Sequence, residues 1–369
     1  MKKSLTSLEL HYVVHELQFL IESKVDKIYH PEKDKLIIQF HNAKGKTILN
    51  VQSGKYMFIT DKKPEAIEPT GFCMKLRKTL DNARLRELHQ FGSERIVEFV
   101  FEKKEGISKL IIEFFSTGNI ILIDDQEIIQ AAVYYDEWRD RIIRPKAKYS
   151  YPKKELNYFE LDKEKLLHLV QDSTKDSIVT TLAVELGIGG TYSEEICRLA
   201  EIKKNTIPGS VTKKEFDALF DALSNVMKKA IKPVQILDNN VIIDIVPFPM
   251  KVYSDFEKLP FPSYNEALND YFSKYQPKKV TQKEKEIEKV KRIILQQEQK
   301  IKELEEAEIQ DKSKADIIYQ NYQLIDEILK EVNKAKEKYS WEEIRSKLKG
   351  HKIIKELNTK DKKLLVELT

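Results

Sequence analysis

The pair of residues best suited to polar chemistry is Glu94-Arg95, an acid and a base in adjacent positions at the start of an apolar run. A carboxylate and a guanidinium can transfer protons together or hold a polar ligand. The pair begins a strand-like stretch, which places it at a rim and not in a core. Neighbouring residues on a strand point to opposite faces, so the pair gives little support for acid–base catalysis.

Histidines and cysteines give no clear metal or nucleophile pattern. His11 and His15 lie four residues apart on a predicted helix and could bind a metal, but such histidines more often flank an apolar stripe. Cys73 and Cys197 match no metal spacing and are expected to be buried, small apolar residues. The chain has no phosphate-binding loop, dinucleotide fingerprint, HExxH or nucleophile elbow. We therefore expect no cofactor, no metal and no enzyme activity.

Basic residues concentrate in two segments. The first, Gly71–Arg86, is predicted to be helical to about Leu80, and the second, Trp138–Lys154, carries seven basic residues against one acidic. Trp138, Tyr149 and Tyr151 are interleaved with the second run, where rings could stack on bases or cap the sheet, while the cations attract phosphate. The alternative is a solvated linker between domains. The basic side chains of this second run include Arg139, Arg141, Arg144, Lys146 and Lys148.

A glycine-rich hairpin lies within Leu186–Glu194, between two helical stripes. Gly187, Gly189 and Gly190 would let backbone N–H groups approach a phosphate at a helix N-terminus, as in a helix-hairpin-helix element. Thr191 and Glu194 have the spacing of a capping box. The alternative is that the glycines serve tight packing alone.

Composition defines the class of protein. With 41% apolar and 34% charged residues among 369, the chain is expected to be soluble and to form two or three domains. It has no apolar run of eighteen residues, and its N-terminus becomes polar too early for a signal peptide, so we expect a cytoplasmic protein. The net charge of +4, from 64 basic and 60 acidic residues, is too small to indicate nucleic-acid binding by itself.

The elements that would position these residues form an α+β unit on an antiparallel sheet. Thr6 and Glu9 form a capping box before a first helix. A meander follows the basic helix, with glycine-containing turns between its strands. The predicted strands are Lys24–His30, Lys35–His41, Lys46–Gln52, Lys55–Thr60, Arg95–Phe101, Ser108–Phe115, Asn119–Ile123 and Ile128–Val133.

We predict three domains, at residues 1–155, 156–276 and 277–369. The middle one is mostly helical, with a small hairpin at Val234–Pro247 and a closing helix at Tyr264–Phe272. After Pro277 a coiled-coil seam begins, which Asp311–Ser313 would interrupt. Its positions are Ile287, Val290, Ile294, Gln297, Ile301 and Leu304, then Ile318, Tyr322, Ile325, Leu329 and Val332.

The seam needs a partner helix, supplied either by a turn within Glu308–Ala315 or, as we favour, by a separate segment that pairs with one long rod. Trp341–Leu348 is predicted to be a short helix and Lys352–Leu368 a strand-turn-strand. Because no further domain follows Thr369, we expect an N-terminal fragment of a longer protein.

Several stretches in order along the chain resemble the NFACT family, the RqcH/NEMF-type ribosome-associated quality-control factors formerly grouped as fibronectin-binding protein A-like. They are Thr6–Leu17, Gly71–Leu80, Leu88–Phe101, Thr117–Asp124, the glycine hairpin, Pro262–Phe272 and Ile317–Leu329. The composition, rich in Lys, Ile and Glu, suggests an archaeal member. The family's C-terminal NFACT-R domain is absent from the sequence.

The resemblance implies an N-terminal domain similar to that of formamidopyrimidine-DNA glycosylases, then a helix-hairpin-helix domain and a coiled-coil arm. It implies binding to a large ribosomal subunit that carries a stalled peptidyl-tRNA, and recruitment of alanyl-tRNA for an untemplated C-terminal tail. An Asp-Arg pair linked to tRNA recognition in the family corresponds to Glu94-Arg95 here, with one methylene more in the acid. Lys75, Arg77, Lys78, Arg84 and Arg86 would add diffuse attraction for tRNA.

Two other functions stay open. One is a DNA-repair glycosylase or lyase retained on the glycosylase-like fold, although Met1-Lys2-Lys3 replaces the catalytic Pro-Glu terminus of those enzymes. The other is a scaffold that acts through the coil alone, possible only if residues 280–369 bind the partner as well as the whole chain does. Self-association through the coil is a further expectation.

Overall fold

A computed structural model describes residues 2–43, 45–62, 68–138, 141–152, 156–274, 290, 294, 297, 300–301, 304–305, 308, 311–348, 353–358 and 363–366. The chain divides into two compact units, Met1–Gln276 and Pro277–Thr369. The predicted boundary after residue 155 adjoins residues 153–155, which lie outside the described residues. In the described segments no helix has the length and apolar character needed to cross a membrane.

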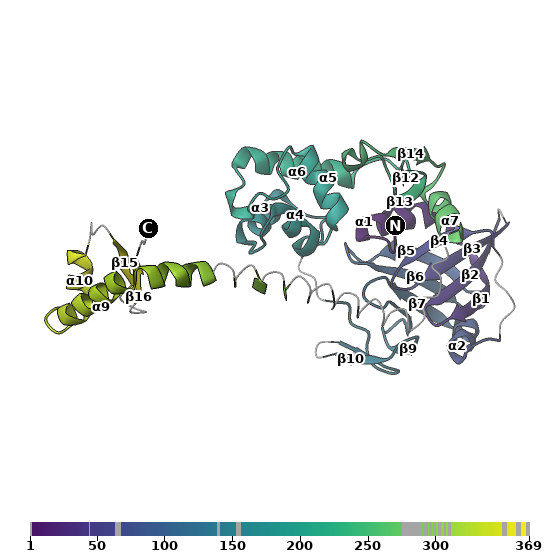
Figure 1. Ribbon diagram of the computed structural model, residues 1–369. Coiled ribbons are helices and arrows are strands. Elements are labelled where there is room, and N and C mark those ends of the chain that lie inside the picture. The colour runs from purple at the N-terminus through teal and green to yellow at the C-terminus, as the bar shows by residue number, and fades with distance from the viewer. Residues whose placement is uncertain are drawn as a thin grey trace. The chain divides into compact units, whose positions relative to one another are not determined.

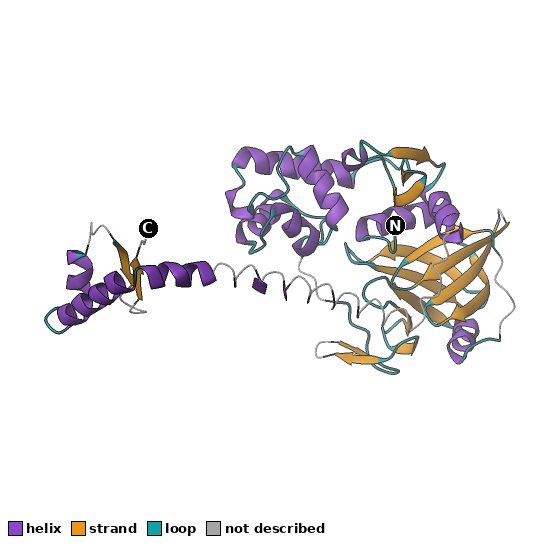
Figure 2. Ribbon diagram, viewed as in Figure 1, coloured by secondary structure: helices purple, strands orange, loops and turns teal. Residues whose placement is uncertain are grey.

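A nine-stranded antiparallel sheet forms the centre of the first unit (Figure 2). Its strand order is β4-β3-β2-β1-β5-β6-β7-β8-β9, so all neighbours except β1 and β5 are also consecutive in sequence. The predicted α+β class with a large antiparallel sheet is confirmed. The strands are β1 (Lys24–Glu32), β2 (Lys35–Asn42), β3 (Gly45–Gln52), β4 (Tyr56–Thr60), β5 (Arg84–Gln90), β6 (Ile96–Lys103), β7 (Gly106–Glu113), β8 (Asn119–Asp124) and β9 (Ile129–Ala132).

Apolar clusters cover the two faces of this sheet. Alternate residues of β6 and β8 enter different clusters: Val97 and Ile120 belong to the larger and Ile96 and Ile121 to the smaller. Helices α1 (Ser7–Glu16) and α2 (Gly71–Leu80) pack on the sheet with the larger cluster. The central strands are therefore buried on both sides, where alternation alone predicts one solvated face.

Most sequence-predicted elements of this unit are confirmed. Thr6 and Glu9 cap α1 reciprocally, and α2 spans the predicted Gly71–Leu80. Strand β5 was not predicted, because its register shifts between Leu85 and Glu87 and breaks the two-residue period of its apolar side chains.

Two turns from opposite halves of the sheet meet. Gly54, in the β3–β4 turn, donates its N–H to the Glu113 carbonyl at the end of β7 (3.0 Å). Gly118, between β7 and β8, has a φ of +77°, and a Cβ there would lie 2.0 Å from the Gly54 nitrogen. Only glycine permits this close contact between the backbones of the two turns.

A helical region follows the sheet and shares its larger apolar cluster (Figure 1). It contains α3 (Lys163–Asp172), α4 (Ile178–Thr180), a π-helical turn (Thr181–Glu185), α5 (Gly190–Leu199) and α6 (Lys213–Met227). The predicted capping box of Thr191 and Glu194 is wrong. Helix α5 starts at Gly190 with Gly189 as its N-cap, so Thr191 already lies in the first turn.

A three-stranded sheet and a closing helix complete the first unit. Strands β12 (Val234–Asp238) and β13 (Val241–Val246) form the predicted hairpin, in which Asn239 and Asn240 both adopt positive φ. Strand β14 (Glu257–Pro260), which was not predicted, pairs with β12. Helix α7 (Tyr264–Lys274) follows, as predicted.

In the second unit the first part of the predicted coil leaves its described apolar positions open, whereas Val332 of the second part is buried. Val290, Ile294, Ile301 and Leu304 are each about half exposed, whereas Ile287 lies outside the described residues. The predicted interruption at Asp311–Ser313 is wrong: residues 311–320 are helical, and the break comes at residue 321.

The rest of the second unit packs around a helix. Helix α9 (Tyr322–Lys336) buries Ile328 and Val332 against β15 (Ile354–Asn358), and Trp341 of α10 (Trp341–Lys347) lies against the same cluster. Strand β15 pairs with β16 (Lys363–Val366), which is the predicted strand-turn-strand.

Candidate nucleic-acid interface

Arg95 lies in the turn before β6, not on the strand as the sequence suggested, so the expectation of opposite faces does not apply to Glu94 and Arg95. Its Nη2 donates to the Gly54 carbonyl across 3.4 Å, which is long for a hydrogen bond. Its Nε is buried and has no hydrogen-bond partner among the residues that the structure describes. Burial lowers the pKa of Arg95, an effect that the nearby Glu9 carboxylate opposes. The guanidinium is thus half-buried, weakly held and short of an acceptor.

The turn that carries Arg95 is fixed to the start of α1. The Gln90 side-chain amide donates to the Ser7 carbonyl (3.0 Å), the Ser7 hydroxyl (2.9 Å) and the Glu94 carbonyl (2.7 Å). The Ser7 hydroxyl donates to the Ser93 carbonyl. These bonds hold the backbone of the turn, so the position of Arg95 is set before any ligand arrives.

A buried ionic cluster beside α1 was not anticipated from the sequence. The Lys2 ammonium lies 2.6 Å from Glu9 Oε1 and 2.7 Å from Asp244 Oδ1, and its side chain is 6% exposed. Tyr192 donates its hydroxyl to Glu9 (2.9 Å) and Tyr253 donates to Asp244 (2.6 Å). Burial alone would lower the pKa of Lys2, but the two carboxylates raise it, so the amine is protonated.

The glycine hairpin lies next to this cluster. Gly187 and Gly189 have φ values of 79° and 91°, which explains two of the three glycines. A Cβ at Gly189 would lie 3.4 Å from the Thr6 methyl group, so the hairpin touches the cap of α1. Gly190 has open space where a Cβ would project. The glycine hairpin and the Arg95 turn therefore both lie at the N-terminal end of α1. The hairpin contacts Thr6, and the turn is bonded to Ser7.

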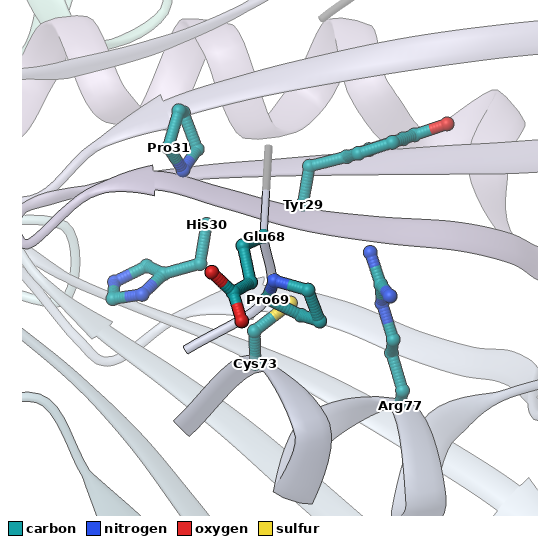
Figure 3. Close-up of a pocket in the computed structure, with 7 residues that line it drawn as sticks. All are labelled: Tyr29, His30, Pro31, Glu68, Pro69, Cys73 and Arg77. Atoms are coloured by element: carbon teal, nitrogen blue, oxygen red, sulfur yellow. The ribbon is translucent and has the colours of Figure 1, made fainter. Parts of the chain in front are cut away.

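The basic residues of α2 lie on the partly or fully exposed side of this helix. Lys78 is exposed and Lys75 half-buried, while Arg77 donates from Nε to the Ile28 carbonyl (2.8 Å). Arg77, His30 and Cys73 line a cavity of about 10 Å³ (Figure 3), which has room for roughly one water. That cavity is too small to be a ligand site.

The other predicted basic contacts are largely occupied by carboxylates. Arg84 and Arg86 on β5 are partly exposed, and both pair with Glu22. Arg86 also pairs with Glu102. These exposed pairs reduce the local positive charge, although each is weak enough to exchange partners.

The basic run after β9 folds back on the sheet. Arg141 pairs with the buried Glu113, to which Tyr149 also donates (2.9 Å). The Tyr151 ring stacks on Phe91 with 3.9 Å between centroids, which places the run beside the Arg95 turn. Of the two roles considered for these rings, capping the sheet is confirmed for Tyr149 and Tyr151. The Arg144 guanidinium lies 3.9 Å from the Glu137 carboxylate, and the Lys148 ammonium lies 3.3 Å from the Glu127 carboxylate. Lys146 adopts a positive φ. Arg139 lies outside the described residues.

His89 gives the β5–β6 hairpin a pH-sensitive contact. Its Nε2 lies 3.6 Å from the buried Glu98 carboxylate, and this interaction raises the pKa of His89 above its usual 6.5. A raised folded-state pKa adds stability that is fully present below pH 6.5 and is lost as the pH rises through the folded value.

We therefore expect the stability difference between wild type and His89→Gln to shrink as the pH rises from about 6 to about 8. Urea unfolding of both proteins across this range measures it. Burial lowers the pKa values of His11 and His30, so these two residues make stability rise with pH. Both proteins contain them, so their effect cancels in the difference. A difference that stays constant with pH would contradict the assignment.

Among the residues that the structure describes, no group of three or more His, Cys, Asp or Glu side chains is arranged to hold a metal ion. The His11 ring packs against Phe159 at a tilt of 33°, with ring centroids 4.4 Å apart. Cys73 and Cys197 are both buried, as expected, and neither forms a disulfide.

Known proteins share both sequence and fold with the chain. It is 35% identical to the archaeal Rqc2 homolog aRqcH of Methanocaldococcus jannaschii, over 95% of this chain and 55% of that protein. It is 26% identical to the human ribosome quality control complex subunit NEMF, over 93% of this chain and 35% of that protein. The chain thus spans about half, or less, of the length of these curated relatives.

A solved structure, the N-terminal part of the fibronectin/fibrinogen-binding protein from Streptococcus suis, superposes with a TM-score of 0.59 at 23% identity. The superposition covers 74% of this chain and all of that one, and supports the fold alone. Residues 6–362 match the family described as NFACT N-terminal and middle domains. The chain therefore belongs to the NFACT family.

Proposed function

We propose that this chain is the tRNA- and ribosome-binding part of a ribosome-associated quality-control factor. The names of its relatives support the pathway, and the half-buried Arg95 with its unfilled Nε carries the proposed contact. A guanidinium donor that already lies out of water gains a charge-assisted hydrogen bond to a phosphate or base edge with little further desolvation. Arg95 would supply the specific contact, and Glu94 would orient the neighbouring polar group.

Weaker contacts would extend the interface. Lys75, Arg77, Lys78, Arg84 and Arg86, together with the run from Arg139 to Lys148, would add sequence-independent attraction for the RNA backbone. The glycine hairpin, with Gly187, Gly189, Gly190 and Thr191, would act as a helix-hairpin-helix contact because no side-chain cap occupies the N-terminus of α5. The sheet domain would correspond to the glycosylase-like fold, used here for RNA.

In this proposal the chain performs no covalent step. It would bind a large ribosomal subunit with a stalled peptidyl-tRNA in the cytoplasm and position tRNA for untemplated tailing by the ribosome. The family resemblance points to alanyl-tRNA. The state of Lys2 argues against a repair lyase. Its amine is protonated and enclosed by two carboxylates, whereas a Schiff-base lysine needs a neutral, accessible amine. The open coil positions, Val290, Ile294, Ile301 and Leu304, would pair with another helix, such as that of a second copy.

The direct test compares Arg95→Ala with Lys78→Ala in tRNA binding across salt concentrations. Loss of a phosphate contact at exposed Lys78 should reduce the salt slope by about one for every tRNA. Loss of Arg95 should cost about 1–3 kcal/mol and reduce discrimination between tRNAs if it reads a base edge. Filter binding with purified tRNA-Ala and a mixed tRNA pool measures both.

Thermal melts of the two variants control for folding. The Arg95 side chain makes one long hydrogen bond to a described residue, so its truncation should leave the fold intact. If Arg95→Ala keeps wild-type affinity and tRNA preference, the role of Arg95 is wrong. Cleavage of an abasic or oxidised DNA duplex by the wild-type chain would instead support the repair alternative.

A further inference from the structure

A large groove lies on the first unit, away from the residues proposed to bind RNA. It has a volume of about 730 Å³ and is formed by the 3-10 helix Leu17–Leu20, the end of β4, helix α7 and the loop before α7. Grooves of roughly 300–1,000 Å³ are typical of ligand sites in proteins. None of the Arg95 turn, the glycine hairpin or the basic segments lines it.

Its walls are fixed by hydrogen bonds, so the groove exists before any partner binds. The Glu16 carboxylate accepts from the backbone N–H groups of Tyr264 (2.7 Å) and Asn265 (2.8 Å), which caps α7 from α1. The Ile59 N–H donates to the Asn265 side chain (3.1 Å), which closes the edge strand β4 against α7. A preformed site binds with a smaller loss of conformational entropy.

The floor of the groove is apolar and open to solvent. Phe19 is 47% exposed, although Leu17 and Leu20 on the same short helix are fully buried. Ile59 and Phe261 add half-buried apolar surface beside it. A concave surface with an exposed aromatic ring favours a partner that brings its own large apolar side chain.

The charged side chains that line the groove have one sign. Its charged lining residues, among those that the structure describes, are all acidic: Glu16, Asp61, Glu266 and Asp270. Glu16 is occupied by backbone donors, and Asp270 pairs with Lys274 at the border. Among the described residues, Asp61 forms no ion pair and the Glu266 carboxylate accepts only from the Ser263 hydroxyl (3.2 Å). The surplus negative charge repels phosphate, so RNA is an unsuitable occupant.

We propose that this groove binds a cationic peptide segment of a protein partner, in which lysine or arginine side chains flank a large apolar residue. The apolar side chain enters between Phe19, Ile59 and Phe261, and the cations face Asp61 and Glu266. Charge complementarity selects this partner over an acidic or neutral peptide. The proposal does not depend on RNA binding and uses none of its residues.

The test uses the full 369-residue chain and a fluorescein-labelled synthetic peptide that alternates lysine with leucine and carries one tryptophan. Fluorescence polarisation should detect binding that weakens with salt, and a counterpart with glutamate in place of lysine should not bind. The variant Asp61→Lys/Glu266→Lys should lose about tenfold or more in affinity. Phe19→Ser should weaken binding through the apolar contact, and its exposed position leaves the fold unaffected.

A matched control carries the same charge change elsewhere. Asp172→Lys/Asp221→Lys alters two exposed carboxylates of α3 and α6 that do not line the groove, and it should keep the peptide affinity within about twofold. Equal losses in both double variants would mean only that net charge attracts the peptide, and would overturn the proposal. So would unchanged binding by Phe19→Ser, a loss of tRNA affinity in the groove variant, or a dimer of the wild-type chain that Phe19→Ser dissociates.

Discussion

Lys2→Met is expected to lower the free energy of unfolding by about 3–5 kcal/mol, because it leaves two buried carboxylates without their cation. Lys2 lies between Glu9 and Asp244, and the side chains of Lys2 and Glu9 are almost fully buried. Methionine fills similar volume, so the loss is electrostatic and not a cavity effect. Urea unfolding at pH 7 measures it, and Lys3→Met is the matched control, since Lys3 is exposed.

The pH dependence of Lys2→Met separates this mechanism from simple misfolding. Burial raises the pKa of Glu9, so without Lys2 this group can take up a proton at mildly acidic pH and lose its need for a cation. The stability deficit of Lys2→Met should therefore shrink as the pH falls from 7 toward about 4.5. Adding Glu9→Gln should recover part of the loss at pH 7. A deficit no larger than that of Lys3→Met would contradict the assigned role of the cluster.

Gly118→Ala is expected to cost several kcal/mol of stability, on the order of 3 or more. A Cβ at Gly118 would lie 2.0 Å from the Gly54 nitrogen and 2.3 Å from the Ser53 carbonyl carbon. Both contacts are with backbone held in another turn, so relief requires the two turns to separate. The positive φ of Gly118 adds strain of its own.

Gly106→Ala is the natural comparison for this prediction. Gly106 also has a positive φ (+132°) in a turn of the same sheet, but a Cβ there meets nothing within 4 Å. It should show only the backbone strain, about 1 kcal/mol. Chemical denaturation of the two alanine variants beside wild type gives both values. Similar losses at the two glycines would show that the contact between the turns contributes nothing beyond backbone conformation.

The elements of this fold were largely predictable because local patterns decide them. Helix α2 follows the predicted Gly71–Leu80, and the Asn239–Asn240 turn sets the β12–β13 hairpin. Strand β5 escaped prediction because a bulge breaks its alternation. The cap at Thr191 was wrong because Gly189, which has a positive φ and lies two residues earlier, is already the N-cap of α5.

The candidate site was predictable only in part. The sequence places Glu94 and Arg95 at a rim, but it does not show that Arg95 Nη2 contacts the distant β3–β4 turn or that its Nε lacks a partner among the described residues. The ionic cluster joins Lys2 to Asp244, and no local pattern links positions that far apart. Contacts of this kind require the tertiary fold, which periodicity does not encode.

The N-terminal and C-terminal segments of the first unit contact each other. Lys2 binds Asp244, Glu16 caps α7, and Tyr271 donates to the Lys2 carbonyl (3.4 Å), so the last helix seals the beginning of the chain. A single backbone break between the sheet and the helical bundle would consequently leave two fragments that remain associated. An expressed segment that stops at residue 155 would instead expose the surface that α5 and α7 normally cover, and would tend to aggregate.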